Sequence, residues 1–220
     1  MRLLVCSRTC LPRFVNEPVT HFVSLVDPDE TDAIKHSPKS TQKKMQLVFS
    51  DLDDVEIMLP MFSKYAPPEP QHVEELVKFG RDLERLPDWG LLAHCEAGIS
   101  RSTAAAITIL TSAGYKPQMA FGLVRRICPD MLPNRRILRM ADETLKTGGV
   151  LEHMAEVHRA KAFRRVGHDD PTTLRLRDAM AEMNSPWGRI RSLFRRMTGV
   201  RQPDPRKAAK YLNGSNGKKH

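Results

Sequence analysis

The stretch that most constrains this chain is His94-Cys95-Glu96-Ala97-Gly98-Ile99-Ser100-Arg101-Ser102. An apolar run over residues 91–93 leads into it, and a helix-forming run over residues 103–110 leads out of it. The pattern predicts a buried strand, a tight loop and a helix, in that order. The backbone amides of such a loop and the amino end of the helix would converge on one point, where they favour an anion.

Cys95 and Arg101 stand at the two ends of the predicted loop, six positions apart. The positive field at a helix start favours the thiolate of a cysteine, which is its nucleophilic form. The planar guanidinium of Arg101 can bind two oxygens of one phosphate. A thiolate beneath a bound phosphate suits phosphoryl transfer through a cysteinyl-phosphate. The plainer alternative is a buried structural cysteine near a helix start, with Arg101 in solvent.

These residues resemble the His-Cys-x5-Arg-Ser/Thr signature of the protein tyrosine phosphatase superfamily, in its dual-specificity-like branch, and the small bacterial-type members in particular. The resemblance covers roughly residues 1–150. It implies that Cys95 is the nucleophile, Arg101 the phosphate clamp, Ser102 a hydrogen-bond partner of the sulfur and His94 the residue that orients the loop. It implies no cofactor and no metal. The loop positions that would surround the phosphate are Glu96, Ala97, Gly98, Ile99, Ser100 and Arg101.

The general acid of this family is an Asp on the loop after an upstream strand. Asp51, Asp53 and Asp54 all follow the strand predicted over residues 45–49. We favour Asp51, because Phe49-x-Asp51 matches the family's spacing out of that strand. The separation from Asp51 to Cys95 exceeds the usual one, and the Pro-rich stretch near residues 66–70 could absorb the excess. Asp53 and Asp54 remain alternatives, and a solvated acidic strand end is the plain interpretation of all three.

The rest of the first 150 residues alternates strands and helices. Such alternation predicts an α/β fold with a mostly parallel central sheet flanked by helices, which is tyrosine-phosphatase-like. Gly114 is placed to end the helix after the loop, Pro117 to open the next one, and Asn134 to cap a third. The other predicted strands span residues 3–6 and 21–26, and a further helix spans residues 71–86.

The net charge of +9 is concentrated at the carboxyl end, where residues 159–220 hold 16 Lys and Arg against 5 Asp and Glu. We therefore divide the chain into a catalytic domain over 1–150 and a basic extension over 151–220, partly helical and disordered at its end. The extension carries an apolar stripe at helical spacing, which either packs back on the catalytic domain or meets an anionic membrane surface, nucleic acid or acidic partner. The apolar residues are Trp187, Ile190, Leu193, Phe194 and Met197, and the basic ones are Arg189, Arg191, Arg195 and Arg196.

The variable loop positions contain no Lys or Arg, which favours a substrate with a single phosphate, such as a phosphoprotein. An RNA 5′-phosphatase of the same chemistry and a phosphate-binding pseudophosphatase are the alternatives. The four cysteines lack the spacing of a disulfide framework, and no apolar run is long enough to span a membrane. These features predict a cytoplasmic location without a transmembrane segment.

Overall fold

Four parallel strands form the centre of the fold, in the order β1-β4-β2-β3. They are β1 (Arg2–Ser7), β2 (His21–Val26), β3 (Lys43–Val48) and β4 (Gly90–Cys95). The structure is a computed structural model that describes residues 1–29, 33–54 and 56–165. Its parallel sheet and the helices that cover it confirm the predicted α/β class. Because the strands are parallel, their carboxyl ends meet at one edge of the sheet.

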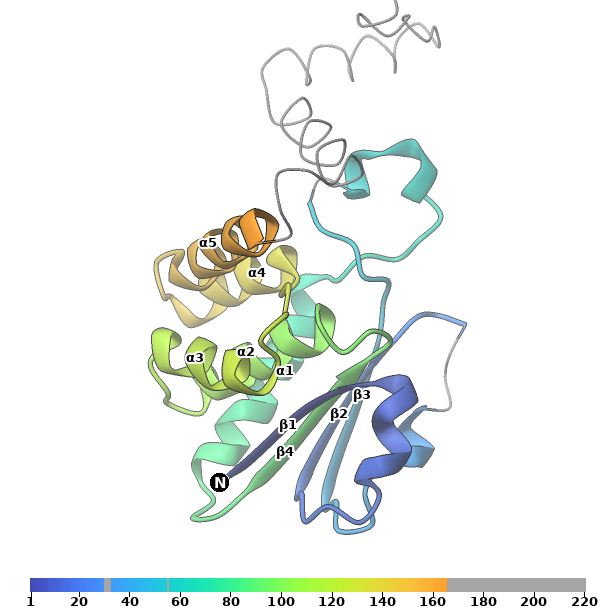
Figure 1. Cartoon of the computed structure of the whole chain (residues 1–220), viewed down its shortest axis with the longest axis vertical. Coiled ribbons are helices and arrows are strands. Elements are labelled where there is room, and N and C mark those ends of the chain that lie inside the picture. Colours follow the sequence, from blue (N-terminus) through green and yellow to red (C-terminus); the bar gives the residue numbers. More distant parts are fainter. Residues whose placement is uncertain (30–32, 55, 166–220) are drawn as a thin grey trace, which may run out of the picture. The chain divides into compact units, whose positions relative to one another are not determined.

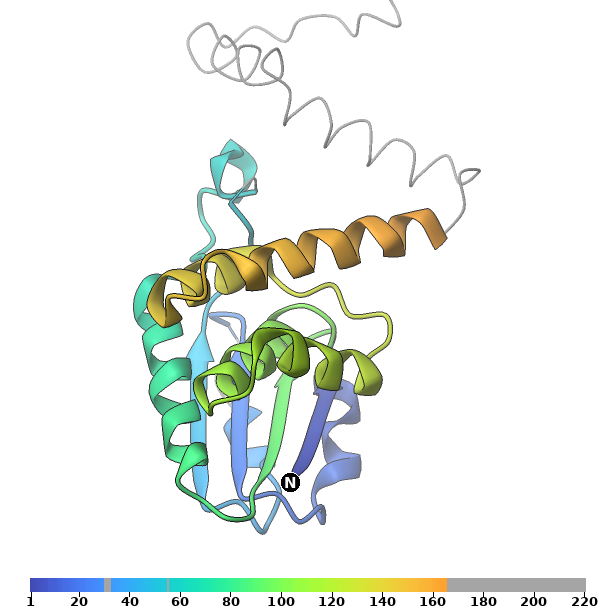
Figure 2. The same cartoon turned by 90° about the vertical axis from the view of Figure 1, so that its left-hand side faces the viewer.

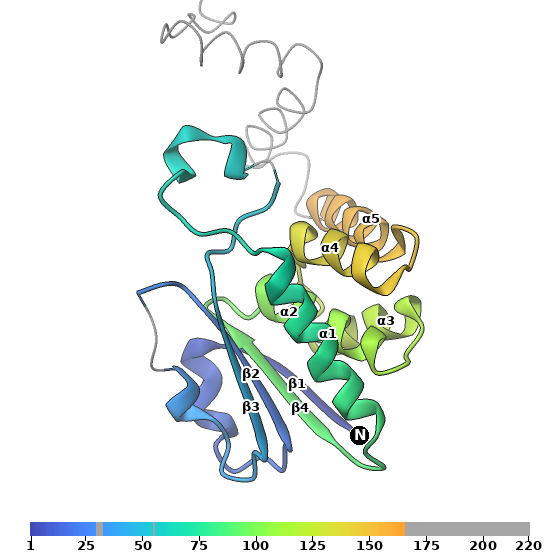
Figure 3. The same cartoon turned by 180° about the vertical axis from the view of Figure 1, so that it is seen from behind.

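Five α-helices lie on one face of the sheet, as Figures 1 and 3 show from opposite sides. The other face is covered by two short 3-10 helices, η1 (Arg8–Phe14) and η2 (Ala33–His36). The sheet is flanked by helices as predicted, but its two faces differ. The main core lies under the α-helices, and a smaller core lies under η1. The α-helices are α1 (Pro70–Glu84), α2 (Arg101–Ser112), α3 (Pro117–Ile127), α4 (Arg135–Leu145) and α5 (Val150–Arg165).

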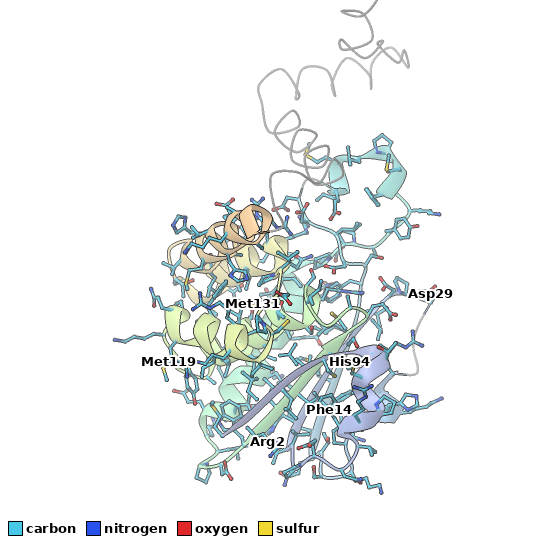
Figure 4. The ribbon with its side chains drawn as sticks, viewed as in Figure 1. Arg2, Phe14, Asp29, His94, Met119 and Met131 are labelled. Carbon is cyan, nitrogen blue, oxygen red and sulfur yellow. The ribbon has the colours of Figure 1, made fainter. Side chains whose placement is uncertain are left out.

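Strand β4 runs through the middle of the sheet and is buried along its whole length. Alternate side chains of a strand point to opposite faces. Leu91, Ala93 and Cys95 accordingly join the main core under the helices, whereas Leu92 packs in the smaller core. This alternation sends Cys95 and His94 to opposite sides, and Figure 4 shows the labelled His94 on the side of η1 and Phe14.

The helix boundaries follow the local signals in the sequence. Pro117 occupies the first turn of α3, where a missing backbone N–H costs nothing. The Asn134 side chain accepts a hydrogen bond from the Ile137 amide and caps α4. Gly114, with φ of 87°, follows the end of α2 in the left-handed conformation that glycine adopts easily. All three boundaries match the prediction.

Helix α5 lies in the extension that was predicted to be partly helical, but it belongs to the same compact unit as the sheet, Met1–Arg165. Its Leu151 and Ala155 are buried in the main core, and Figure 2 shows it lying across α4. The expected domain boundary at residue 150 thus falls where α5 begins. The apolar and basic residues of the extension, from Trp187 to Met197, lie outside the described residues. In the part of the chain that the structure describes, no helix combines the length and apolarity needed to cross a membrane.

Candidate active site

The loop between β4 and α2 lies at the carboxyl edge of the sheet. Gly98 makes its turn with φ of 75°, a conformation that other residues adopt only with strain. A Cβ atom at Gly98 would lie 2.4 Å from the Ser7 amide nitrogen and 2.6 Å from the Cys6 carbonyl carbon. The loop therefore passes against the end of β1 so closely that only glycine fits. The Arg8 amide ties down its first residue by donating to the Glu96 carbonyl at 3.2 Å.

The Cys95 sulfur lies at the base of this loop with hydrogen-bonding groups around it. The Gly98 amide donates to Cys95 Sγ at 3.2 Å, and Ser102 Oγ lies 3.2 Å from the same sulfur. The side chain of Cys95 is 1% exposed. A sulfur that accepts hydrogen bonds from an amide and a hydroxyl is better able to carry negative charge. The loop brings together Cys95, Gly98 and Ser102 as the sequence predicts.

Two other cysteines near the site have raised pKa values. Burial, reinforced by repulsion from Cys10 and Cys95, raises the pKa of Cys6 to about 12. Burial also raises the pKa of Cys128, with smaller contributions from Asp130 and Cys95. Both are protonated thiols at neutral pH, and thiols are poor nucleophiles compared with thiolates.

The Arg101 guanidinium is 3% exposed and is held from two directions. Its Nη1 donates to the Phe49 carbonyl at 2.8 Å, and its Nη2 donates to Asp27 Oδ2 at 2.8 Å. Its Nε donates to no acceptor within the described residues, and the nearest carboxylate oxygen, Asp51 Oδ2, lies 3.9 Å away. A buried cation held by a carboxylate and a carbonyl is fixed in orientation, so Arg101 is preorganised beside the loop.

Asp51 reaches the loop from the end of β3. Its Oδ1 accepts a hydrogen bond from Ser100 Oγ at 2.7 Å and another from Asn134 Nδ2 at 2.9 Å. Its side chain remains 32% exposed, so a substrate can approach it. The structure therefore places Asp51 next to both Ser100 and Arg101 of the loop.

The other two aspartates are bound to arginines of the helices. Asp53 is mostly buried and lies 3.4 Å from Arg159 Nη1. Asp54 accepts hydrogen bonds from Arg136 and from Arg139. Partial burial opposes ionisation of Asp54, but those hydrogen bonds outweigh it and hold its pKa below the ordinary value. An acid with a lowered pKa is poorly suited to donate a proton near neutral pH.

The side chain of His94 is buried beside the smaller core, on Phe22. Its ring stacks on Phe22 with the centroids 5.3 Å apart, and neither ring nitrogen makes a hydrogen bond of acceptable geometry within the described residues. Burial lowers the pKa of His94 to about 4, although an interaction with the Cys95 backbone opposes part of that change. The loop-orienting role that the resemblance implies for His94 stays a prediction.

Two residues of this site, Asp27 and Asn134, were missed as site residues. Asp27 follows β2 directly, and Asn134 was predicted to cap a helix. The position of Asp27 directly after a predicted strand could have placed it near the loop, because the carboxyl ends of parallel strands meet at one edge of a sheet. No local signal links Asn134 to Asp51, because the two are 83 positions apart. Among the described residues, no cluster of three or more His, Cys, Asp or Glu is placed to hold a metal ion.

Comparison with known proteins gives matches among solved structures alone. No family model matches the chain, and no curated protein matches it. Human DUSP28 has 17% identity and a TM-score of 0.48, covering 66% of this chain and 92% of its own. Tk-PTP in its active form has 18% identity and a TM-score of 0.45, with the same coverage. PTPMT1 in complex with PI(5)P has 16% identity and a TM-score of 0.45, covering 66% and 91%. The structural neighbours are dual-specificity and tyrosine phosphatases.

Proposed function

We propose that this chain is a cysteine-dependent phosphatase that hydrolyses phosphomonoesters through a cysteinyl-phosphate intermediate. One observation carries the proposal. The Cys95 sulfur accepts a hydrogen bond from the Gly98 amide and contacts Ser102 Oγ, in a loop that ends at the buried, carboxylate-held Arg101. Anion-stabilising groups thus surround both the nucleophile and the place where a phosphate would sit.

The first chemical step follows from this arrangement. The Cys95 thiolate attacks phosphorus, so that an S–P bond forms while the P–O bond to the leaving group breaks. Asp51 in its acid form gives its proton to the departing oxygen. Arg101 neutralises charge on the equatorial phosphate oxygens, which is the main requirement for phosphoryl transfer.

The second step releases phosphate. Asp51, now a carboxylate, takes a proton from water while the water oxygen attacks phosphorus. The S–P bond breaks, and the electron pair returns to the Cys95 sulfur. The Ser102 hydroxyl, 3.2 Å from that sulfur, stabilises the departing thiolate. One carboxyl group therefore serves as acid and then as base.

The substrate that we propose is a phosphoprotein with a single phosphate at the site. The exposed loop side chains are Glu96, Ala97 and Ile99, and none of them is a cation that could hold further phosphates. The carboxylate of Glu96 is paired with Arg8 at 3.5 Å.

The test is hydrolysis of p-nitrophenyl phosphate by the parent chain and by Cys95→Ser, with Cys10→Ser as a matched control. We expect Cys95→Ser to be inactive but still to bind phosphate, because a serine hydroxyl does not ionise in this field. We expect Cys10→Ser to retain activity. A parent chain that binds phosphate without turnover would instead be a binding module. Comparison of phosphopeptides with 5′-triphosphorylated RNA then distinguishes the two substrate classes.

A further inference from the structure

A second concave surface lies between α3 and α5, and none of its lining residues belongs to the Cys95 loop. It is a cavity of about 300 Å³. Its apolar lining is formed by Phe121, Met154 and Val157. Val157 is 40% exposed, although an aliphatic side chain of a helix is more stable when it is buried. Figure 1 shows α3 and α5 next to each other in the helical layer.

The same groove is basic. Arg125 on α3 and Lys161 on α5 line it, with Gln118, His153 and His158, and no Asp or Glu lines it. Neither Arg125 nor Lys161 forms an ion pair within the described residues. The two carboxylates of α5 nearest to these positions, Glu152 and Glu156, are both paired with Arg135. Among the described residues, the two cations Arg125 and Lys161 thus add positive charge to the groove with no carboxylate paired to them.

The lining residues follow helical spacing on both walls. On α3 they are residues 118, 121, 122 and 125, and on α5 they are residues 153, 154, 157, 158 and 161. Each set covers one face over about two turns, or about 10 Å. Gly122 keeps the centre of the groove open, since a Cβ atom added there would meet nothing within 4 Å.

We propose that this groove is a docking site for an acidic amphipathic helical segment of a partner protein. The apolar floor would receive the apolar face of such a helix, and the basic rim would pair with its carboxylates. Helical spacing on both walls suits a helix of two to three turns, and the flexible Met154 can adapt to its side chains. A phosphate backbone would satisfy the rim but would leave the floor uncovered, which is why a peptide fits better than nucleic acid.

The test measures binding of a fluorescent peptide of about 12 residues, roughly three helical turns, with Leu at i, i+3, i+4 and i+7 and Glu elsewhere. The full chain is used, so that its basic extension contributes equally to every variant. Gly122→Met fills the groove, and Lys161→Glu reverses a rim charge. Arg126→Glu is the matched control, because Arg126 is exposed on α3 and does not line the groove. Circular dichroism melting establishes that each variant is folded.

We expect Gly122→Met and Lys161→Glu each to weaken binding by about tenfold or more, and Arg126→Glu to change it by less than about twofold. A scrambled peptide of the same composition should bind at least about tenfold more weakly. The proposal is overturned if the scrambled peptide binds equally well, or if Arg126→Glu weakens binding as much as Lys161→Glu. It is also overturned if Gly122→Met leaves peptide binding unchanged. The same holds if Gly122→Met weakens the binding of a single-stranded oligonucleotide instead of the peptide.

Discussion

Asn134 links the end of one helix to the candidate general acid. Its side-chain oxygen accepts the Ile137 amide at 3.0 Å, which caps α4. Its side-chain nitrogen donates to Asp51 at 2.9 Å and to the Leu52 carbonyl at 3.1 Å. A single amide thus anchors the Asp51 loop to the start of α4. Asp27 has a comparable relation to Arg101, and both residues position groups for which we propose a part in catalysis.

Substitution Asn134→Ser separates the two tasks of this residue. Serine retains an oxygen that can cap α4 but loses the donor to Asp51. We expect the unfolding free energy to fall by about 1–3 kcal/mol, because the buried Leu52 carbonyl also loses its donor. We expect kcat to fall roughly tenfold for poor leaving groups, a part of the 10²–10⁴-fold that general acid catalysis typically supplies. Steady-state kinetics on phenyl and p-nitrophenyl phosphate test this, and an equal fall for both substrates would contradict it.

His94 makes stability depend on pH. Its pKa is about 4 in the native state, against roughly 6.5 in an unfolded chain. Between these values the unfolded state binds a proton that the native state does not. The contribution of neutral His94 is therefore complete above pH 6.5, and about 3 kcal/mol is lost as the pH falls to 4. Urea unfolding at several pH values should give a shallower dependence for His94→Gln than for the parent, and parallel curves would rule this out.

At the scale of elements, α1 and α2 pack at unusually close range. A Cβ atom at Gly80 of α1 would lie 2.4 Å from the Ile109 carbonyl oxygen and 2.8 Å from Ser112 Cβ. Ser112 Oγ also donates to the Val77 carbonyl at 2.5 Å, which joins the two helices. Since α2 begins at Arg101, its position against α1 helps to place the catalytic loop.

Substitution Gly80→Ala tests this packing, with Gly122→Ala as its control. Alanine raises helix propensity equally at both positions, by about 0.5–1 kcal/mol. At Gly122 nothing opposes that gain, so we expect a more stable protein. At Gly80 the clash with the α2 backbone should cost about 1–3 kcal/mol and outweigh it. Chemical denaturation measures both, and equal shifts at the two sites would mean that the helices separate without cost.

At the scale of the whole molecule, the compact unit ends at Arg165 and the charge continues beyond it. Residues 185–220 hold 10 Lys and Arg against a single Asp. Such a segment is attracted to anionic surfaces, and the attraction weakens as salt screens it. The compact unit contains all the residues proposed for the chemistry. We therefore expect catalysis and attraction to anions to belong to different parts of the chain.

Deletion of residues 185–220 should leave hydrolysis of p-nitrophenyl phosphate nearly unchanged. It should strongly reduce binding to vesicles that contain anionic lipid, because it removes most of the excess positive charge. Vesicle co-sedimentation at low and moderate salt measures this, with zwitterionic vesicles as the control. A deletion variant that fails to fold would show that Trp187 and Phe194 belong to the core instead.

The sequence alone determined the class of fold, the loop from Cys95 to Arg101 and most helix boundaries, because each depends on local signals. The spacing of Cys95 and Arg101, the Gly98 turn and the Asn134 cap are all readable within a few residues. The bounds of helix α5 and its place in the compact unit were not predicted, because its apolar periodicity is weak.

Only the tertiary structure decided which aspartate reaches the loop and what holds Arg101. Asp51, Asp53 and Asp54 are near neighbours in the sequence. Asp53 and Asp54 nevertheless pair with arginines of α5 and α4, whereas Asp51 accepts hydrogen bonds from Ser100 and Asn134. The partnership of Asp27 with Arg101 arises because parallel strands bring residues 74 positions apart to one edge. Pairings between distant residues depend on how the elements pack, and no local pattern contains that information.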